Sequence, residues 1–451
     1  MSEVDSRATF YRQGSWMVIA TFVSGVLMFA VQQIAWFWMR DEEYGLFGTL
    51  LMVLNLMMIP ALGLQTVFAQ QTAAVTDEQQ QHDLARSIRK VLLSCLYLWM
   101  GISMLVILLH EPIIKSLKIG NPAAIWITLL ICLPQLWLPV MMGILQGKQN
   151  FTWLGTVAIA NGAGRFITVG LIVTLLGGQA AGATMGVLIG LTITCILAGW
   201  HSRVAWLGQE HVDKGKFEAK LWLIRIVPLT FGLGAGHFML SADMLAARAI
   251  LPGIDSGPYS YAGTIGRGLV IFTLPLAAVM FPKLIREDIQ SKQSGIIGQT
   301  FLATMLLGVL TALACSGAAW ALPSILNHFD ALTARREALA DIVALIPFFV
   351  WSMLPLALAN VFVAALMARE RYRAVPWLVA IAIAYGLTLV WLTKTAYSPT
   401  TLESWMGFWY TTDAIPPSQQ TIILTLGGFN LVFLGTAAAL AKRYAAPLEC
   451  R

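Results

Sequence analysis

The chain alternates between long apolar runs and short polar segments along nearly its whole length. A helix needs about 20 consecutive apolar residues to cross the hydrocarbon layer of a membrane. The first apolar run is longer than the core of a signal peptide and lacks a small-residue cleavage site, so we interpret it as an uncleaved span. The pattern predicts twelve membrane-spanning helices, at residues 15–38, 46–68, 91–110, 123–145, 153–176, 180–200, 221–250, 258–281, 297–320, 340–368, 376–394 and 421–441.

The composition agrees with this pattern. Of the 451 residues, 58% are hydrophobic and only 12% are charged, whereas a soluble domain carries about 25% charged residues. These values exclude a soluble enzyme, a disordered protein and a nucleic-acid-binding protein, and they predict an all-α polytopic membrane protein. Four of the five cysteines lie in apolar runs, and no Cys or His cluster has the spacing of metal ligands. We therefore expect neither a disulfide framework nor a metal site.

The basic residues are distributed unequally between the two sets of alternating loops. Nineteen lysines and arginines fall in one set and six in the other. Because cytoplasmic loops carry an excess of Lys and Arg, this bias predicts an even number of spans with both termini in the cytoplasm. It also accounts for the net charge of +6 without a nucleic-acid partner.

A weak internal repeat relates the two halves of the chain. Tyr44 and Pro60 are 16 residues apart, and Tyr259 and Pro275 have the same separation at an offset of 215 residues. We therefore predict a six-helix lobe at 1–200, a basic cytoplasmic linker at 201–220 and a second six-helix lobe at 221–451. Two lobes with a binding site between them are typical of a transporter.

Arg165 is the arginine closest to the middle of a predicted span. An arginine at the centre of a bilayer costs about 2.5–3.5 kcal/mol on insertion scales, so it needs a compensating role. The residues before it, Asn161 to Gly164, are small or polar and allow close approach of neighbouring helices. Two interpretations follow: Arg165 faces an internal cavity and binds an anionic substrate, or it binds the carbonyl groups of a broken neighbouring helix.

Asp243 and Arg267 lie at similar depth in the seventh and eighth spans, which a short turn joins. They can form an ion pair across this hairpin with a purely structural role. Alternatively, Arg267 binds an anionic substrate and Asp243 is its partner or a site of ion coupling. The sequence leaves both alternatives open.

The remaining candidates are also polar residues in apolar surroundings. Arg248 is a candidate substrate-binding residue, although it is near the outer edge and can snorkel to the interface. His237 is a candidate proton relay or a satisfied core histidine. Gln33 and Asn55 can hydrogen-bond sugar hydroxyls or hold helices together.

Several short motifs occur in the same order, and at the same span ends, as in a known family. They are Asp41-Glu-Glu-Tyr-Gly-Leu-Phe47, Gly63-Leu-Gln65, Leu145-Gln-Gly-Lys-Gln-Asn-Phe151, Ala242-Asp-Met-Leu245, Gly257-Pro-Tyr259, Ile265-Gly-Arg267, Phe281-Pro282 and Met367-Ala-Arg369. Together they resemble the motifs of Wzx-type polysaccharide flippases, which belong to the multidrug/oligosaccharidyl-lipid/polysaccharide exporter superfamily. The positions of Asp243 and Arg267 match that pattern, whereas Arg165 matches no motif.

The resemblance implies two related six-helix lobes around a central cavity in the bacterial cytoplasmic (inner) membrane. It also implies a flippase that moves an undecaprenyl-pyrophosphate-linked oligosaccharide by alternating access for lipopolysaccharide or exopolysaccharide synthesis. We expect no enzymatic activity and no cofactor, with coupling to a proton or sodium gradient. The expected partners are the lipid-linked oligosaccharide, membrane lipids, a polysaccharide polymerase and glycosyltransferases. The alternatives are a drug/cation antiporter of the same superfamily and a non-catalytic membrane component of a polysaccharide assembly complex.

Overall fold

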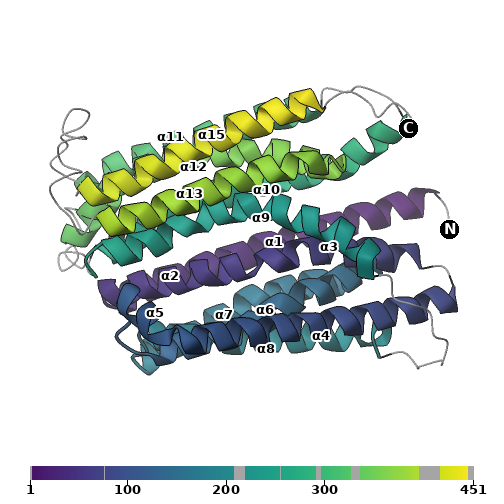
Figure 1. Cartoon of the computed structure of the whole chain (residues 1–451), viewed down its shortest axis with the longest axis horizontal. Coiled ribbons are helices and arrows are strands. Elements are labelled where there is room, and N and C mark those ends of the chain that lie inside the picture. Colours follow the sequence, from purple (N-terminus) through teal and green to yellow (C-terminus); the bar gives the residue numbers. More distant parts are fainter. Residues whose placement is uncertain are drawn as a thin grey trace. The chain divides into compact units, whose positions relative to one another are not determined.

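A computed structural model describes residues 3–75, 77–207, 219–253, 255–290, 296–326, 336–395 and 417–444. All regular elements in these ranges are helices, which confirms the predicted all-α fold class (Figure 1). Contacts divide the chain into two units, Met1–Thr230 and Phe231–Arg451. The predicted linker falls largely at 208–218, outside the described residues, so the predicted domain boundaries stay a prediction.

The helices of the first unit begin near the N-terminus and end at the start of α9. They are α1 (Glu3–Trp38), α2 (Asp41–Met57), α3 (Ile59–Ala74), α4 (Glu78–Leu108), α5 (His110–Ser116), α6 (Ala123–Gly147), α7 (Phe151–Leu175) and α8 (Ala180–Ser202), followed by the short 3-10 helix η1 (Arg203–Ala205). Helices α2 and α3 together make one candidate span, Asp41–Ala73. The break between them falls at Met58, and Pro60, in the first turn of α3, has no backbone N–H to donate to the preceding turn.

The helices of the second unit are longer on average. They are α9 (Ala219–Ile250), whose first turns belong to the first unit, α10 (Ser256–Gln290), α11 (Ile296–Leu326), α12 (Arg336–Ala368), α13 (Val375–Thr395) and α15 (Pro417–Arg443), with the 3-10 helix η3 (Tyr372–Ala374) before α13. Helix α12 lies at the centre of this unit, where it packs against α10, α11 and α15.

Ten segments among the described residues are long and apolar enough to cross a membrane. They correspond to ten of the twelve predicted spans. The other two predicted spans fall on α9 and α10, which have 32 and 35 residues. These two helices are long enough to span, and they carry the polar side chains of His237, Asp243, Arg248 and Arg267.

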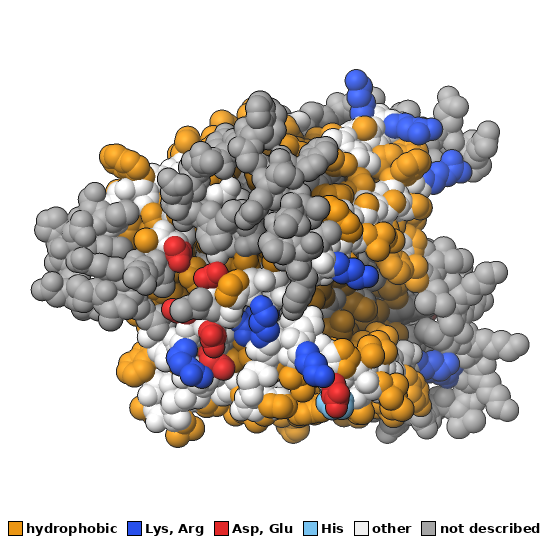
Figure 2. Space-filling view, turned by 60° about the vertical axis from the view of Figure 1, so that its left-hand side comes forward, with side chains coloured by type: hydrophobic (Ala, Val, Ile, Leu, Met, Phe, Trp, Pro, Cys, Tyr) orange, Lys and Arg blue, Asp and Glu red, His pale blue; other side chains and the backbone are white. Residues whose placement is uncertain are grey.

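The outer surface of the described helices is strongly apolar (Figure 2). Large hydrophobic side chains are exposed along α4, including Tyr97, Met104 and Leu108, and along α11 and α15. In Figure 2 the charged side chains gather in groups, while apolar ones cover much of the remaining described surface. Such extensive exposed apolar surface is not stable in water, and it fits helices that face lipid.

In the first unit, glycines bring helix backbones into direct contact. Helix α7 packs against α1 and α8, and α6 packs against α3 and α8. A Cβ atom added at Gly190 of α8 would lie 2.5 Å from the backbone nitrogen of Arg165, and one at Gly162 would lie 2.8 Å from the carbonyl oxygen of Ser24. The hydroxyl of Thr168 also donates to the carbonyl oxygen of Gly186 at 2.6 Å. This packing fixes α7, and with it the backbone of Arg165.

In the second unit, α12 contains two internal prolines, Pro347 and Pro355. Pro355 cannot donate a hydrogen bond to the carbonyl of Trp351, one turn earlier. At the next residue, the side-chain amide of Asn430 on α15 donates to the carbonyl oxygen of Ser352 at 2.8 Å. Helix α15 therefore supports α12 at the proline-containing turn.

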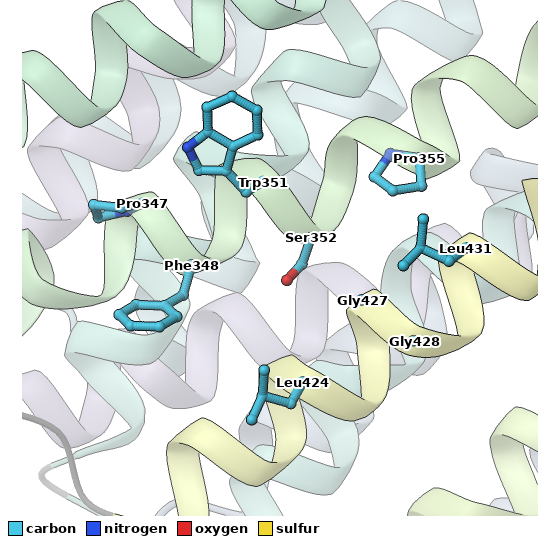
Figure 3. Close-up of a pocket in the computed structure, with 9 residues that line it drawn as sticks. All are labelled: Pro347, Phe348, Trp351, Ser352, Pro355, Leu424, Gly427, Gly428 and Leu431. Atoms are coloured by element: carbon cyan, nitrogen blue, oxygen red, sulfur yellow. The ribbon is translucent and has the colours of Figure 1, made fainter. Parts of the chain in front are cut away.

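Beside this contact, α12 and α15 form a shallow groove of about 400 Å³ (Figure 3). Two prolines, two glycines and large apolar side chains line it: Pro347, Phe348, Trp351, Ser352, Pro355, Leu424, Gly427, Gly428 and Leu431. The groove exists because prolines and glycines leave space where larger helix-forming residues would fill it. Trp351 and Leu431 at its rim are exposed.

Candidate functional site

Asp243 and Arg267 form a buried ion pair between α9 and α10. The distance from Arg267 Nη2 to Asp243 Oδ2 is 2.6 Å, and the two side chains are 4% and 0% exposed. Arg267 Nε also donates to the carbonyl oxygen of Leu240 at 2.9 Å. The two residues are therefore paired across the hairpin, and whether the pair has a structural role or a role in binding and coupling stays a prediction.

Two glycines make room for the Arg267 side chain. A Cβ atom at Gly263, one turn earlier, would lie 2.6 Å from Arg267 Nη1. At Gly266, it would lie 2.8 Å from the Cβ atom of Phe349 on α12. The glycine before the arginine in the motif Ile265-Gly-Arg267 therefore lets α10 approach α12 closely.

Two tyrosines complete the cluster around the ion pair. Tyr259 donates its hydroxyl to Asp243 Oδ2 at 3.2 Å, and its ring packs edge-on against Phe349. Tyr385 of α13 is also fully buried and lies close enough to interact electrostatically with Asp243 and Arg267. Asp243 Oδ1 and the hydroxyl of Tyr385 are both buried, and neither has a hydrogen-bond partner among the described residues.

Arg248 is buried in the turn between α9 and α10. Its Nη1 donates to Ser256 Oγ and to the carbonyl oxygen of Gly253, and Ser256 Oγ donates to the same carbonyl at 2.6 Å. The side chain, 3% exposed, does not snorkel to a surface. It holds the end of one helix to the start of the next, and its predicted role in substrate binding stays a prediction.

Arg165 lies on α7, and no carboxylate among the described residues forms an ion pair with it. Its Nη2 is 3.4 Å from Oε1 of Gln135 on α6, and its Nε is buried without a hydrogen-bond partner among the described residues. The side chain is half-buried, whereas Gln135 is only 8% exposed. One turn earlier on α7, Asn161 Oδ1 is also buried and lacks a partner within the described part of the chain.

The other predicted residues do not join either cluster through a described hydrogen bond. His237 is half-buried on α9, beside Gly236, where an added Cβ atom would meet the side chain of Asn360. Asn55 is half-buried on α2 and contacts the sulfur of Met52 at 3.7 Å. Gln33 is half-buried on α1. Their predicted roles stay predictions.

Three further residues carry little or no signal in the sequence. Gln135 is one of several uncharged polar residues at depth that can hydrogen-bond sugar hydroxyls or hold helices together, and Tyr385 carries no signal because a lone tyrosine in an apolar helix is common. Glu43 belongs to the motif at the start of α2, and its Oε2 accepts a hydrogen bond from the backbone nitrogen of Ala180 at 3.0 Å. This carboxylate therefore caps the N-terminus of α8, where a negative charge is favourable.

The described residues contain no group of three or more His, Cys, Asp or Glu side chains that could hold a metal ion. The clusters that they do contain are suited to electrostatic binding. A guanidinium group presents five donors in a planar fork that matches phosphate oxygens. Of Arg165, Arg248 and Arg267, Arg165 has the fewest protein acceptors among the described residues, a single amide oxygen at 3.4 Å.

Comparisons with known proteins support the fold and the family. A family model described as "Polysaccharide biosynthesis protein" matches residues 10–286. No curated protein sequence matches the chain significantly.

Solved structures of the MOP superfamily resemble the whole chain. An inward-facing multidrug resistance MATE family transporter aligns with a TM-score of 0.67 at 14% identity, covering 93% of this chain and 96% of the other. The lipid II flippase MurJ in its inward closed conformation aligns with a TM-score of 0.63 at 14% identity, covering 94% and 90%. A MOP superfamily transporter from Pyrococcus furiosus with reverse polarity of its binding pocket aligns with a TM-score of 0.56 at 14% identity, covering 98% and 96%.

Proposed function

Since the chain belongs to the polysaccharide biosynthesis protein family, we propose that it is a flippase for a lipid-linked oligosaccharide. The substrate would be an undecaprenyl-pyrophosphate-linked oligosaccharide, which moves from the inner to the outer leaflet of a bacterial cytoplasmic membrane. This location and a cytoplasmic position of both termini are supported by the apolar helices and by the uneven distribution of basic residues between the loops.

The observation that carries the proposal is that no described carboxylate pairs with Arg165. An arginine near the middle of a membrane span and without a carboxylate partner is costly, so it requires a ligand or a function to retain it. The described residues offer Arg165 only the neutral amide of Gln135. The pyrophosphate of the proposed substrate is a compact anion, and the guanidinium fork binds phosphate oxygens with charge-assisted hydrogen bonds.

In this proposal the second unit contributes the coupling of transport to an ion gradient, through the pair of Asp243 and Arg267. Asp243 already neutralises Arg267, so Arg267 binds substrate only after the pair opens. A proton or a sodium ion that binds Asp243 would open it, and this would couple an ion gradient to transport. His237, on the same helix, is the second candidate for proton transfer. Arg248, Gln33 and Asn55 are candidates for secondary contacts with phosphate and sugar hydroxyls.

A drug/cation antiporter is the competing function, because a multidrug MATE transporter shares the fold. A site for a cationic drug requires an uncompensated acidic residue. The buried Asp243 has an arginine at 2.6 Å, whereas the buried cation of Arg165 has no acidic partner among the described residues. This charge balance favours an anionic substrate. A role as a non-catalytic component of an assembly complex, with a polymerase and glycosyltransferases as partners, is compatible with flipping and would not explain Arg165.

The proposal is tested by reconstituting the purified protein in liposomes with a labelled lipid-linked oligosaccharide. We expect the wild type to translocate it and Arg165→Met to lose at least about 90% of the rate, which corresponds to about 1.4 kcal/mol. Lys115→Ala, which removes an exposed cation from α5, is the matched control and should retain the rate. A folded Arg165→Met variant with the wild-type rate would refute the role of Arg165. Transport of a cationic dye without transport of the oligosaccharide would favour the antiporter.

A further inference from the structure

Gln135 accepts a side-chain hydrogen bond from Arg165, and its side chain is more buried than that of the arginine. It lies on α6, the helix that packs against both α3 and α8, and it is 8% exposed. Its Oε1 is 3.4 Å from Arg165 Nη2, which is at the long end of the hydrogen-bond range. Gln135 therefore orients the guanidinium group of Arg165, and it leaves most of the N–H donors of that group available to a ligand.

The chemical identity of residue 135 matters because an amide and a carboxylate of nearly the same shape have opposite effects here. Both accept a hydrogen bond from a guanidinium group, but only a carboxylate cancels its charge. The second unit contains such a carboxylate beside an arginine, because Asp243 Oδ2 lies 2.6 Å from Arg267 Nη2. With an amide at position 135, Arg165 keeps its full charge for an external anion.

Asn161 adds a requirement that a bare phosphate does not meet. Arg165 Nε is a buried donor, Asn161 Oδ1 is a buried acceptor, and each lacks a partner among the described residues. The two residues are four positions apart, so they lie on the same face of α7. A ligand that presents an anionic oxygen and a hydroxyl next to each other would satisfy both atoms, and a sugar linked to phosphate has this combination.

We propose that Gln135, Arg165 and Asn161 form a subsite for the junction between a pyrophosphate and its first sugar. In this subsite Gln135 is a positioning residue that aims Arg165 without neutralising it, Arg165 binds the phosphate oxygens, and Asn161 accepts a hydrogen bond from a sugar hydroxyl. This inference rests on the proposed function, and it adds which part of the substrate the first unit recognises.

The test measures binding of three short-chain probes to the purified full-length protein in detergent: farnesyl pyrophosphoryl-N-acetylglucosamine, farnesyl pyrophosphate and farnesol. We expect Gln135→Glu to weaken both pyrophosphate probes by about 10-fold or more, because the new carboxylate pairs with Arg165. Gln135→Leu removes the orienting contact without adding charge, so its loss should be smaller. Binding of farnesol, which has no charge, should be unchanged in both variants.

Asn161→Ala separates the sugar contact from the phosphate contact. We expect it to weaken the glycosylated probe by about 5-fold, the effect of one neutral hydrogen bond, and to leave farnesyl pyrophosphate binding unchanged. Equal effects on the two probes would overturn the role assigned to Asn161.

The matched control for the charge change is Gln146→Glu. Gln146 lies on the same helix as Gln135, and its Oε1 accepts a hydrogen bond from the neutral Gln65 Nε2 at 3.3 Å. This control should bind all probes like the wild type. Gln135 has only a packing role, and the inference is wrong, in either of two cases. In the first, Gln135→Leu binds the pyrophosphate probes more weakly than Gln135→Glu does. In the second, farnesol binding falls by the same factor as binding of the pyrophosphate probes.

Failure of this inference and failure of the proposed function give different results. Wild-type binding by Gln135→Glu, together with loss of binding by Arg165→Met, overturns the role of Gln135 and leaves the anion site in place. If Arg165→Met binds both pyrophosphate probes as tightly as the wild type does, Arg165 is not an anion site and the proposed function loses its main support.

Discussion

The two units each carry an arginine within a predicted span, and they surround it in opposite ways. In the second unit, Arg267 has a carboxylate at 2.6 Å and a backbone carbonyl at 2.9 Å. In the first unit, Arg165 has one amide oxygen at 3.4 Å. The difference teaches that the position of an arginine in a span does not identify its role: the compensated arginine is held across its hairpin, whereas in our proposal the uncompensated one binds a ligand.

A pair of tyrosines repeats the same contrast. Tyr44 and Tyr259 are both fully buried at the start of the second helix of their unit, and each donates its hydroxyl back to the preceding helix. The acceptor is the neutral Gln32 at 3.3 Å in the first unit and the charged Asp243 at 3.2 Å in the second. Related hairpins thus carry a neutral contact in one unit and an ionic cluster in the other.

The largest expected effect comes from removing the carboxylate of the ionic cluster. Asp243→Asn leaves Arg267 buried without a counter-charge, and we expect the free energy of unfolding in detergent to fall by about 3–5 kcal/mol. The double variant Asp243→Leu/Arg267→Met removes both charges and should recover most of the loss. A single variant as stable as the wild type would show that the ion pair does not stabilise the hairpin.

The two tyrosines offer a matched pair of milder changes. Tyr259→Phe removes a hydrogen bond to a charged group and should cost about 1.5–3 kcal/mol, whereas Tyr44→Phe removes a neutral one and should cost about 0.5–1.5 kcal/mol. Chemical denaturation of both variants measures the difference. Equal losses would mean that the charge of Asp243 contributes nothing at Tyr259.

Adding a methyl group at residue 190, where α8 contacts α7, tests whether close packing positions the backbone of Arg165. Gly190→Ala places a Cβ atom 2.5 Å from Arg165 N, so the helices must separate, and we expect a loss of about 1–3 kcal/mol together with weaker pyrophosphate binding. Gly170→Ala is the control on α7, because its added Cβ atom meets only a side-chain methyl at an ordinary 3.6 Å. Similar behaviour of both variants would contradict the close-packing argument.

The smallest expected effect on stability comes from replacing the uncompensated arginine. Arg165→Met removes a buried charge that no described carboxylate balances, so the free energy of unfolding should change by less than about 1 kcal/mol or increase. Thermal unfolding in detergent measures this. A loss as large as that of Asp243→Asn would show that Arg165 is structural, and the contrast between the units would disappear.

Much of this architecture follows from the sequence because span length and apolar content are local properties. Ten predicted spans correspond to candidate spans in the described chain, and the similar depth of Asp243 and Arg267 indicated that the two residues can pair. The sequence could not show that Arg165 meets Gln135, since 30 residues separate them and only the packing of α6 against α7 brings them together. It also could not separate Arg248, held in a turn, from an arginine free to bind a ligand.

The glycine contacts of α7 have a mechanical consequence. Gly162 meets the backbone of α1, and Gly164 meets the backbone of α8 at Gly190. Sliding or twisting of α7 against either neighbour would drive main-chain atoms together, because no flexible side chain lies between them to yield. These three helices therefore resist independent displacement. Helix α12 of the second unit differs, because its two internal prolines each remove a backbone hydrogen bond, and the side-chain amide of Asn430 donates to its backbone at Ser352.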